Sequence, residues 1–201
     1  MKFAKTLLIV SFALLFWQCK REDPALAFDS SLIKPTAKYD VADYFLLLPY
    51  QALPQHTTAE RRKLLETANR PAEMLPNPTY FMDVLDRQSG YLRLTMIGGG
   101  QTDQYEVTYW TQPGKPDTVG INYNAIGMPG TSSTPTFYRF VNNEWSVITK
   151  EVFPSVVSPE AGSFQHIIFP QKGTDIIVNV GDSQKRIAVL QWKDGKFIST
   201  D

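Results

Sequence analysis

The spacing of apolar residues changes along the chain, from a helical period near the N-terminus to a period of two further on. In residues 41–48 apolar side chains recur at helical spacing, Asp40 stands in the N-cap position and Pro49 ends the pattern. From residue 91 onward apolar and polar side chains alternate, as in the run YLRLTM. This change of period predicts a short helical segment followed by a β-rich body.

A second helix is predicted over residues 58–68. Thr57 and Glu60 stand three residues apart and match a capping box, in which the hydroxyl accepts from a backbone N–H and the carboxylate reaches back to the cap residue. The two leucines at 64 and 65 are expected to face inward. The charged run at 61–63 is expected to lie on the solvated side of the helix.

Residues 77–97 fit two different structures. Asn77 and Pro78 suit the start of a helix. The same residues, followed by RQSGYLRLTMI, also fit a β-hairpin whose turn spans residues 86–90. We favour the hairpin because the alternation after the turn has a clear period of two.

The rest of the chain predicts a β meander. Short connections require antiparallel neighbours, and the turns between the expected strands carry Gly, Asn and Asp. The fold class is therefore α+β, with two short N-terminal helices packed on a mainly antiparallel meander that forms a curved sheet or a partly open barrel. The expected strands cover residues 91–97, 104–111, 118–123, 136–141, 144–149, 163–169, 174–180, 185–191 and 196–199.

Two of the expected hairpins resemble one another. Phe140 and Trp145 flank an Asn-Asn turn, and Trp192 and Phe197 flank an Asp-Gly turn in the same arrangement. Turn residues of this kind tolerate positive φ, and the flanking rings should pair across the two strands. We expect both hairpins in one sheet, because so few strands would not complete a propeller.

The N-terminus has the pattern of a secretory signal. Residues 1–18 contain a short basic stretch and then an apolar run from residue 6 to residue 17. A membrane-spanning helix needs about 20 apolar residues, so this run is short for a permanent span. We expect a signal peptide at 1–18, a tether at 19–39 and a single globular α+β domain at 40–201.

Cys19 is the only cysteine and directly follows the apolar run. A thiol in this position resembles the lipidated cysteine of bacterial lipoproteins, although residues 16–18 are bulkier than usual there. With the charged run at 20–23 and the stretches DYFLLLPYQALP and ERRKLL, the chain is similar to small uncharacterised secreted lipoproteins of Bacteroidota. The resemblance implies attachment to a membrane through a lipid on Cys19, in an outer membrane lipoprotein that faces the periplasm or the cell surface. A signal cut elsewhere and an uncleaved anchor are the alternatives.

Composition and charge indicate which classes of protein and partner are to be expected. The chain has 201 residues, of which 43% are hydrophobic, and balances 20 basic against 20 acidic side chains. Without residues 1–18, the remaining 18 basic and 20 acidic groups give a formal net charge of −2. A near-neutral chain offers no broad attraction for phosphate backbones, so no nucleic-acid partner is expected. One cysteine permits no disulfide within the chain.

Few residues are available for catalysis. His56 and His166 are the only histidines, and no spacing typical of a zinc site or a nucleophile elbow is present in the sequence. We therefore expect neither an enzyme nor a metal or other cofactor. The alternative is a secreted hydrolase whose site is assembled from scattered residues around His166 or His56.

The remaining candidates are residues of a binding surface. The glycine run Gly98, Gly99 and Gly100 would let a ligand approach the backbone. Tyr109 and Trp110 are adjacent in an expected strand and must point to opposite faces, so one of the two rings could be exposed. The sequence thus favours a lipid-anchored, non-enzymatic binding or structural accessory domain at the cell envelope, with a glycan, a peptide or an envelope protein as its partner.

Overall fold

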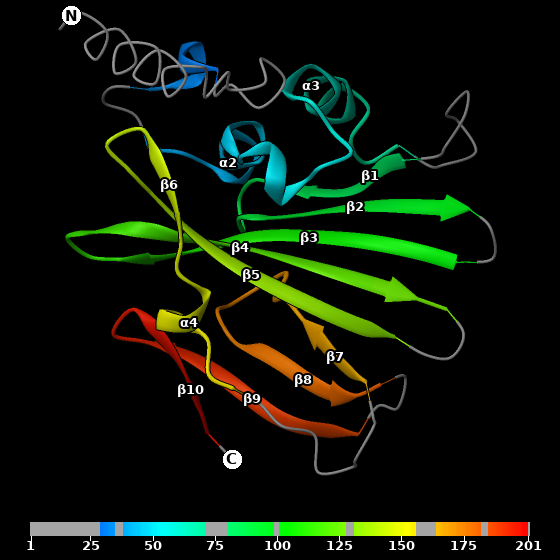
Figure 1. Cartoon of the computed structure of the whole chain (residues 1–201), viewed down its shortest axis with the longest axis vertical. Coiled ribbons are helices and arrows are strands. Elements are labelled where there is room, and N and C mark those ends of the chain that lie inside the picture. The colour runs from blue at the N-terminus through cyan, green and yellow to red at the C-terminus, as the bar shows by residue number, and fades with distance from the viewer. Residues whose placement is uncertain are drawn as a thin grey trace, which may run out of the picture.

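The protein consists of a helical layer, a six-stranded sheet and a four-stranded sheet, stacked in that order (Figure 1). The computed structural model describes residues 29–34, 38–70, 80–98, 101–127, 131–155, 164–181 and 185–200. The expected signal peptide, Cys19 and most of the expected tether lie outside the described residues.

Both predicted helices are present. Asp40 caps α2 (Val41–Leu47) and forms a capping box with Asp43. Thr57 and Glu60 form the predicted capping box of α3 (Thr58–Glu66). The other helical segments are short: η1 (Ser30–Leu32), η2 (Tyr50–Ala52) and α4 (Thr149–Val152).

The first sheet is an antiparallel meander whose six strands follow one another in chain order. The hairpin predicted over residues 77–97 is confirmed, because its two arms pair from Tyr80 opposite Met96 to Asp86 opposite Tyr91. The strands of this sheet are β1 (Tyr80–Asp86), β2 (Tyr91–Gly98), β3 (Gln101–Gln112), β4 (Lys115–Ile126), β5 (Ser132–Val141) and β6 (Glu144–Val147).

The second sheet is a shorter antiparallel meander in the order β10-β9-β8-β7. Its strands are β7 (Gln165–Ile168), β8 (Ile176–Val180), β9 (Arg186–Lys193) and β10 (Lys196–Ser199). In this order β7 is an edge strand, and it lies against the first sheet beside β4 and β5.

The fold is a β-rich α+β fold, as predicted in outline, but three details of the prediction are wrong. The strands form two sheets rather than one curved sheet or barrel. Thr149, predicted at the end of a strand, begins α4, so the helices are not all N-terminal. The two similar hairpins pair their rings as predicted, yet β5-β6 and β9-β10 belong to different sheets. Alternation fixes which face a residue occupies and says nothing about which sheet its strand joins.

Each face of the first sheet carries its own apolar core. Leu92, Val107 and Ile121 stand in register across three strands and pack under the helices with Phe45. On the opposite face Trp110 and Phe137 pack against residues of the second sheet. The ring nitrogen of Trp110 donates to the Thr174 carbonyl at 2.9 Å, so this buried ring is also hydrogen-bonded across the two layers.

The prediction that residues 61–63 all lie on the solvent-exposed face of their helix is wrong for Arg61. Its side chain is 1% exposed, and its guanidinium donates to the carbonyls of Phe45, Leu48 and Pro49. These carbonyls lie in the last turn of α2 or just beyond it, where a helix leaves acceptors without intrahelical partners. A guanidinium carries five N–H donors, so a single side chain serves all three acceptors and ties α3 to α2.

Candidate functional site: a groove at the junction of the two sheets

The free edge of β7 is covered by polar side chains of the first sheet. The backbone N–H of Ile167 donates to Ser133 Oγ at 2.8 Å, and the Ile167 carbonyl accepts from Asn122 Nδ2 at 2.7 Å. The N–H of Phe169 donates to Glu106 Oε2 at 3.4 Å. An edge strand normally presents such groups to solvent or to another chain, and here side chains take the place of a neighbouring strand.

Glu106 is the centre of this network and is 5% exposed. Its Oε1 accepts from the Tyr91 hydroxyl at 2.7 Å, and its Oε2 accepts from the amides of Asn122 at 2.9 Å and Asn124 at 3.0 Å. Buried carboxylates are stable in a fold when several donors compensate for lost water. Glu106 therefore has the surroundings of a structural acceptor.

The Tyr91 hydroxyl stays protonated. Burial and the adjacent Glu106 carboxylate raise the pKa of Tyr91 far above its ordinary value, because both disfavour the charged phenolate. Tyr91 thus remains a hydrogen-bond donor throughout the physiological range. Its hydrogen bond to Glu106 Oε1 helps to position that carboxylate.

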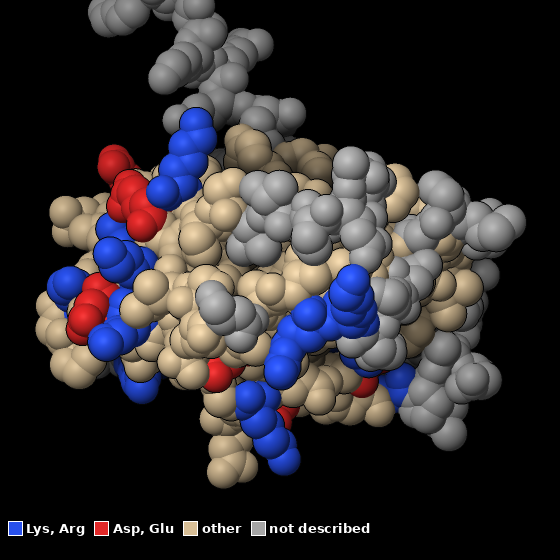
Figure 2. Space-filling view, turned by 90° about the horizontal axis from the view of Figure 1, so that it is seen from below, with Lys and Arg blue, Asp and Glu red and all other residues tan. Residues whose placement is uncertain are grey.

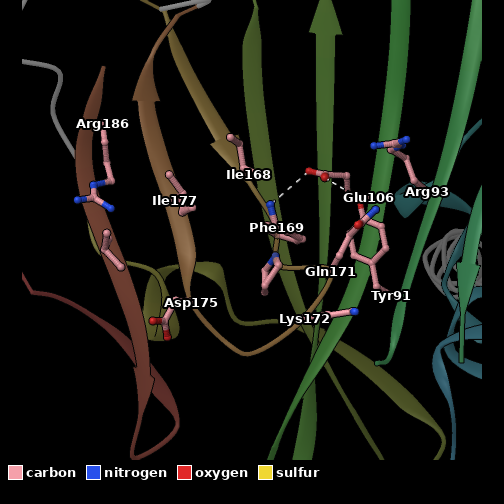
Figure 3. A pocket seen from close by; sticks show the side chains of 12 residues that line it. Tyr91, Arg93, Glu106, Ile168, Phe169, Gln171, Lys172, Asp175, Ile177 and Arg186 are labelled. Atoms are coloured by element: carbon pink, nitrogen blue, oxygen red, sulfur yellow. Dashed lines mark hydrogen bonds between the residues drawn. The ribbon is translucent and has the colours of Figure 1, made fainter. Parts of the chain in front are cut away.

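A groove of about 600 Å³ opens beside this network, where the outer face of the second sheet meets the first sheet (Figure 3). We call it the junction groove. Figure 3 shows Arg93 and Arg186 on opposite sides of the groove, with Phe169 and Glu106 between them. Its lining comprises Tyr91, Arg93 and Glu106 from the first sheet, Ile168, Ile177, Arg186 and Val189 from the second, and Phe169, Pro170, Gln171, Lys172 and Asp175 from the connection between β7 and β8.

Five charged side chains line the junction groove: Arg93, Lys172 and Arg186 are basic, and Glu106 and Asp175 are acidic. Arg93 is held by Asp83, with its Nη2 and Nε atoms 2.6 Å and 2.9 Å from one carboxylate oxygen. Lys172 and Arg186 are exposed, and neither forms an ion pair with another residue that the structure describes. Both cations are accessible to a ligand. The backbone hydrogen bond from Ser89 lowers the pKa of the Asp86 carboxyl, and the charge of Lys172 also contributes to this lowering. The charge of Arg93 is already matched by Asp83.

The sequence around the junction groove is close to electrically balanced. Residues 164–201 contain basic side chains at 172, 185, 186, 193 and 196 and acidic ones at 175, 182, 194 and 201. Figure 2, which views the molecule from below the four-stranded sheet, shows several groups of Lys and Arg and fewer visible Asp and Glu.

The structure does not bring the glycine run and the two aromatic candidates together. Gly98 ends β2 opposite Gln101, whereas Tyr109 and Trp110 lie towards the other end of β3. Tyr109 and Trp110 do point to opposite faces, but Trp110 is 2% exposed and Tyr109 packs against Tyr44 with the ring centroids 5.3 Å apart. Gly99 and Gly100 lie outside the described residues.

The two histidines occupy unrelated places. His56 is buried in the connection before α3 and packs edge-on against Tyr80, with the ring centroids 4.4 Å apart. Burial lowers its pKa, and its Nε2 has no hydrogen-bond partner. His166 lies in β7 opposite Asn179. Neither side chain is hydrogen-bonded to a carboxylate among the described residues, and these residues contain no cluster of three or more metal-binding side chains.

Sequence reasoning missed Glu106, Asn122 and Ser133. The signal that could have found them is the alternation itself, because Asn122 and Asn124 stand two apart in a strand whose other members are mostly apolar. Two polar residues on one face of a buried strand indicate a polar network rather than a hydrophobic core. The sequence could not show that Asn122 and Ser133 both form hydrogen bonds with the backbone of Ile167 in β7.

Comparisons with known proteins show the fold and no function. No protein-family model matches the chain, and no curated protein matches it. It is similar to a solved domain of an uncharacterised protein from Porphyromonas gingivalis W83, with a TM-score of 0.53, 12% identity, and coverage of 82% of this chain and 99% of that one. No helix in the described part of the chain is both long and apolar enough to span a bilayer.

Proposed function

We propose that this protein is a lipid-anchored domain at the cell envelope that binds an anionic, partly apolar ligand in the junction groove. The observation that carries the proposal is that the hydrogen-bonded network around Glu106 lies beside two exposed cations, Lys172 and Arg186, in the junction groove. The role is that of a non-enzymatic accessory protein, as the sequence favours.

The hydrogen-bonded network around Glu106 supports binding because its groups are already ordered before a ligand enters the junction groove. The Glu106 carboxylate already accepts hydrogen bonds from Asn122 and from the Phe169 N–H, and the Ile167 carbonyl of β7 already accepts one from Asn122. A ligand that enters the groove does not need to order these groups, so less conformational entropy is lost on binding.

The residues at the edge of the junction groove suit an anionic ligand that also has an apolar part. Lys172 and Arg186 offer charge-assisted hydrogen bonds to a carboxylate, a phosphate or a sulfonate. Ile168, Ile177 and Val189 form the apolar wall between them, and Ile177 is 36% exposed. Exposed apolar side chains beside unpaired cations are the complement of an amphipathic anion.

The expected lipid anchor at Cys19 supports the proposed location at the cell envelope. Cys19 follows a signal-like apolar run, and about 20 tether residues would separate a lipid on Cys19 from Asp40. Mass spectrometry of the mature N-terminus, with Cys19→Ala as the control, tests this part. We expect a lipid-modified Cys19 as the first residue and loss of membrane fractionation in the variant. An unmodified, soluble product cut elsewhere would refute the anchor.

The binding part is tested with anilinonaphthalene sulfonate, an amphipathic anion whose fluorescence rises on binding. The double variant Lys172→Gln/Arg186→Gln removes the two rim cations, and the matched control Lys193→Gln/Lys196→Gln removes two cations at the β9-β10 turn. We expect the dissociation constant to rise at least about tenfold in the first and to change less than about twofold in the second. Equal affinities in the two double variants would overturn the assignment of the groove.

A further inference from the structure

A second hollow lies on the opposite face of the first sheet and differs in chemistry from the junction groove. Tyr105 points into it, whereas its neighbour Glu106 faces the other side of β3. The hollow has a volume of about 240 Å³ and lies between η2 and strands β3 to β5. We call it the tyrosine hollow; its lining includes Gln51, Tyr105, Tyr123, Thr134, Thr136 and Tyr138.

Two tyrosine rings form its wall. Tyr105 and Tyr123 are directly opposite one another on β3 and β4, with ring centroids 5.0 Å apart and planes inclined at 38°. Both side chains are half-buried, so the rings keep an accessible surface. Helix α2 and its connection to α3 cover the neighbouring apolar positions of this face and leave the pair open.

The Tyr123 ring is also held in place by hydrogen bonds. The Tyr123 hydroxyl donates to Asp103 Oδ1 at 3.0 Å, and Gln101 Nε2 donates to the same oxygen at 2.8 Å. Burial and this hydrogen bond to Asp103 raise the pKa of Tyr123 to about 12, so its hydroxyl stays protonated. A fixed aromatic surface binds with a smaller loss of side-chain entropy than a mobile one.

The polar groups of the hollow are all uncharged. Gln51 and Thr134 are exposed at its rim and Thr136 is half-buried in its wall, and none of the lining residues carries a formal charge. Amide and hydroxyl groups can both donate and accept hydrogen bonds. The hollow therefore suits a neutral ligand rich in hydroxyl groups, unlike the junction groove with its basic rim.

We infer that the tyrosine hollow binds a sugar ring of a neutral glycan. A pyranose has a face of C–H bonds that packs on aromatic rings and a rim of hydroxyls that pairs with amides and hydroxyls, and both features are present here. A proline-rich peptide is the competing ligand, but it rises about 3.1 Å per residue and needs a longer row of aromatic pockets.

A printed array of neutral oligosaccharides tests the inference on the folded wild-type protein, followed by calorimetric titration of the best-bound oligosaccharide. We expect Tyr105→Ala and Tyr123→Ala each to weaken its binding about tenfold, which corresponds to a loss of about 1.4 kcal/mol of binding free energy. Phe164→Ala, at an exposed ring of the second sheet, is the matched control and should leave binding unchanged. The exposed Gln51→Ala variant should weaken binding with no effect on folding.

Three outcomes would overturn the inference: no glycan bound by the folded protein, unchanged binding in both tyrosine variants, or binding of a proline decapeptide alone. The Lys172→Gln/Arg186→Gln protein should bind the glycan as well as the wild type, because those residues line the opposite side of the first sheet. Failure of this inference is therefore distinguishable from failure of the proposed function.

Discussion

The side-chain amide of Asn122 lies 2.7 Å from the carbonyl oxygen of Ile167, so a residue in the middle of one sheet closes the free edge of the other. The two sheets are joined here by side chains that act where a ladder of backbone hydrogen bonds would otherwise continue. This contact fixes the corner in which the junction groove lies.

We expect Asn122→Ala to destabilise the fold by about 1–3 kcal/mol, because the Ile167 carbonyl keeps only the 3.5 Å contact with Ser133 Oγ and the buried Glu106 carboxylate loses one of its donors. Urea unfolding followed by circular dichroism measures the change. Gln191→Ala, at an exposed position of the second sheet, should alter the free energy of unfolding by less than about 0.5 kcal/mol. If the two variants are equally stable, the edge contact does not hold the sheets together.

Arg61 and Arg62 offer a matched pair on one helix. Arg61→Ala removes three hydrogen bonds to buried carbonyls and should cost about 2–4 kcal/mol. Arg62→Ala removes an exposed ion pair with Asp29 and should cost less than about 1 kcal/mol. Thermal unfolding of the two variants compares them directly. An Arg62→Ala protein as unstable as Arg61→Ala would contradict the role assigned to the buried guanidinium.

Gly120 occupies a place that only a residue without a side chain fits. A Cβ atom there would stand 2.7 Å from a ring carbon of Trp110 and 2.9 Å from one of Phe169. We expect Gly120→Ala to destabilise the protein by about 1–3 kcal/mol through overpacking of the core between the sheets. Gly98→Ala, where a Cβ atom would have nothing within 4 Å, is the control and should be nearly neutral. The denaturant midpoints of the two variants measure this difference in stability.

His56 should make stability depend on pH. Its folded-state pKa lies below the ordinary 6.5, mainly because burial penalises the imidazolium. As the pH falls below 6.5 the unfolded chain takes up the proton before the folded one, so the free energy of unfolding decreases until the folded pKa is passed. Above 6.5 the residue contributes no pH dependence.

The pH effect is measured by urea unfolding between pH 5 and pH 8. His56→Gln should flatten the curve just below neutrality, whereas Gln191→Ala, an exposed substitution that removes no titratable group, should leave it as in the wild type. A wild-type slope that survives in the His56→Gln protein would assign the effect to other groups.

The local elements could be predicted because their causes are local. Asp40 and the Thr57–Glu60 pair cap helices through contacts within one turn, and the hairpin arms at residues 80–98 follow the alternation of apolar side chains. Turn residues such as Asn142 and Gly195 adopt the positive φ that their positions require. Each of these features involves residues a few positions apart in the chain.

The functional candidates were harder to predict because they depend on long-range contacts. Tyr109 and Trp110 were correctly assigned to opposite faces, but alternation could not show that Trp110 would be covered by the second sheet. Nor could it show that Arg61 would be buried beneath the end of another helix. Charge and polarity in a sequence indicate a preference for water, which a buried set of hydrogen-bond partners can outweigh.

The sequence by itself determined the helices with their caps, the strands with their faces and the signal-like run before Cys19, since these follow from residue spacing alone. Only the tertiary structure decided that the strands divide into two sheets, that Glu106, Asn122 and Ser133 meet β7, and that Tyr105 and Glu106 face two different hollows. The physical reason is that local propensity acts over one turn or one strand pair, whereas the site is built by contacts between residues 34 to 63 positions apart.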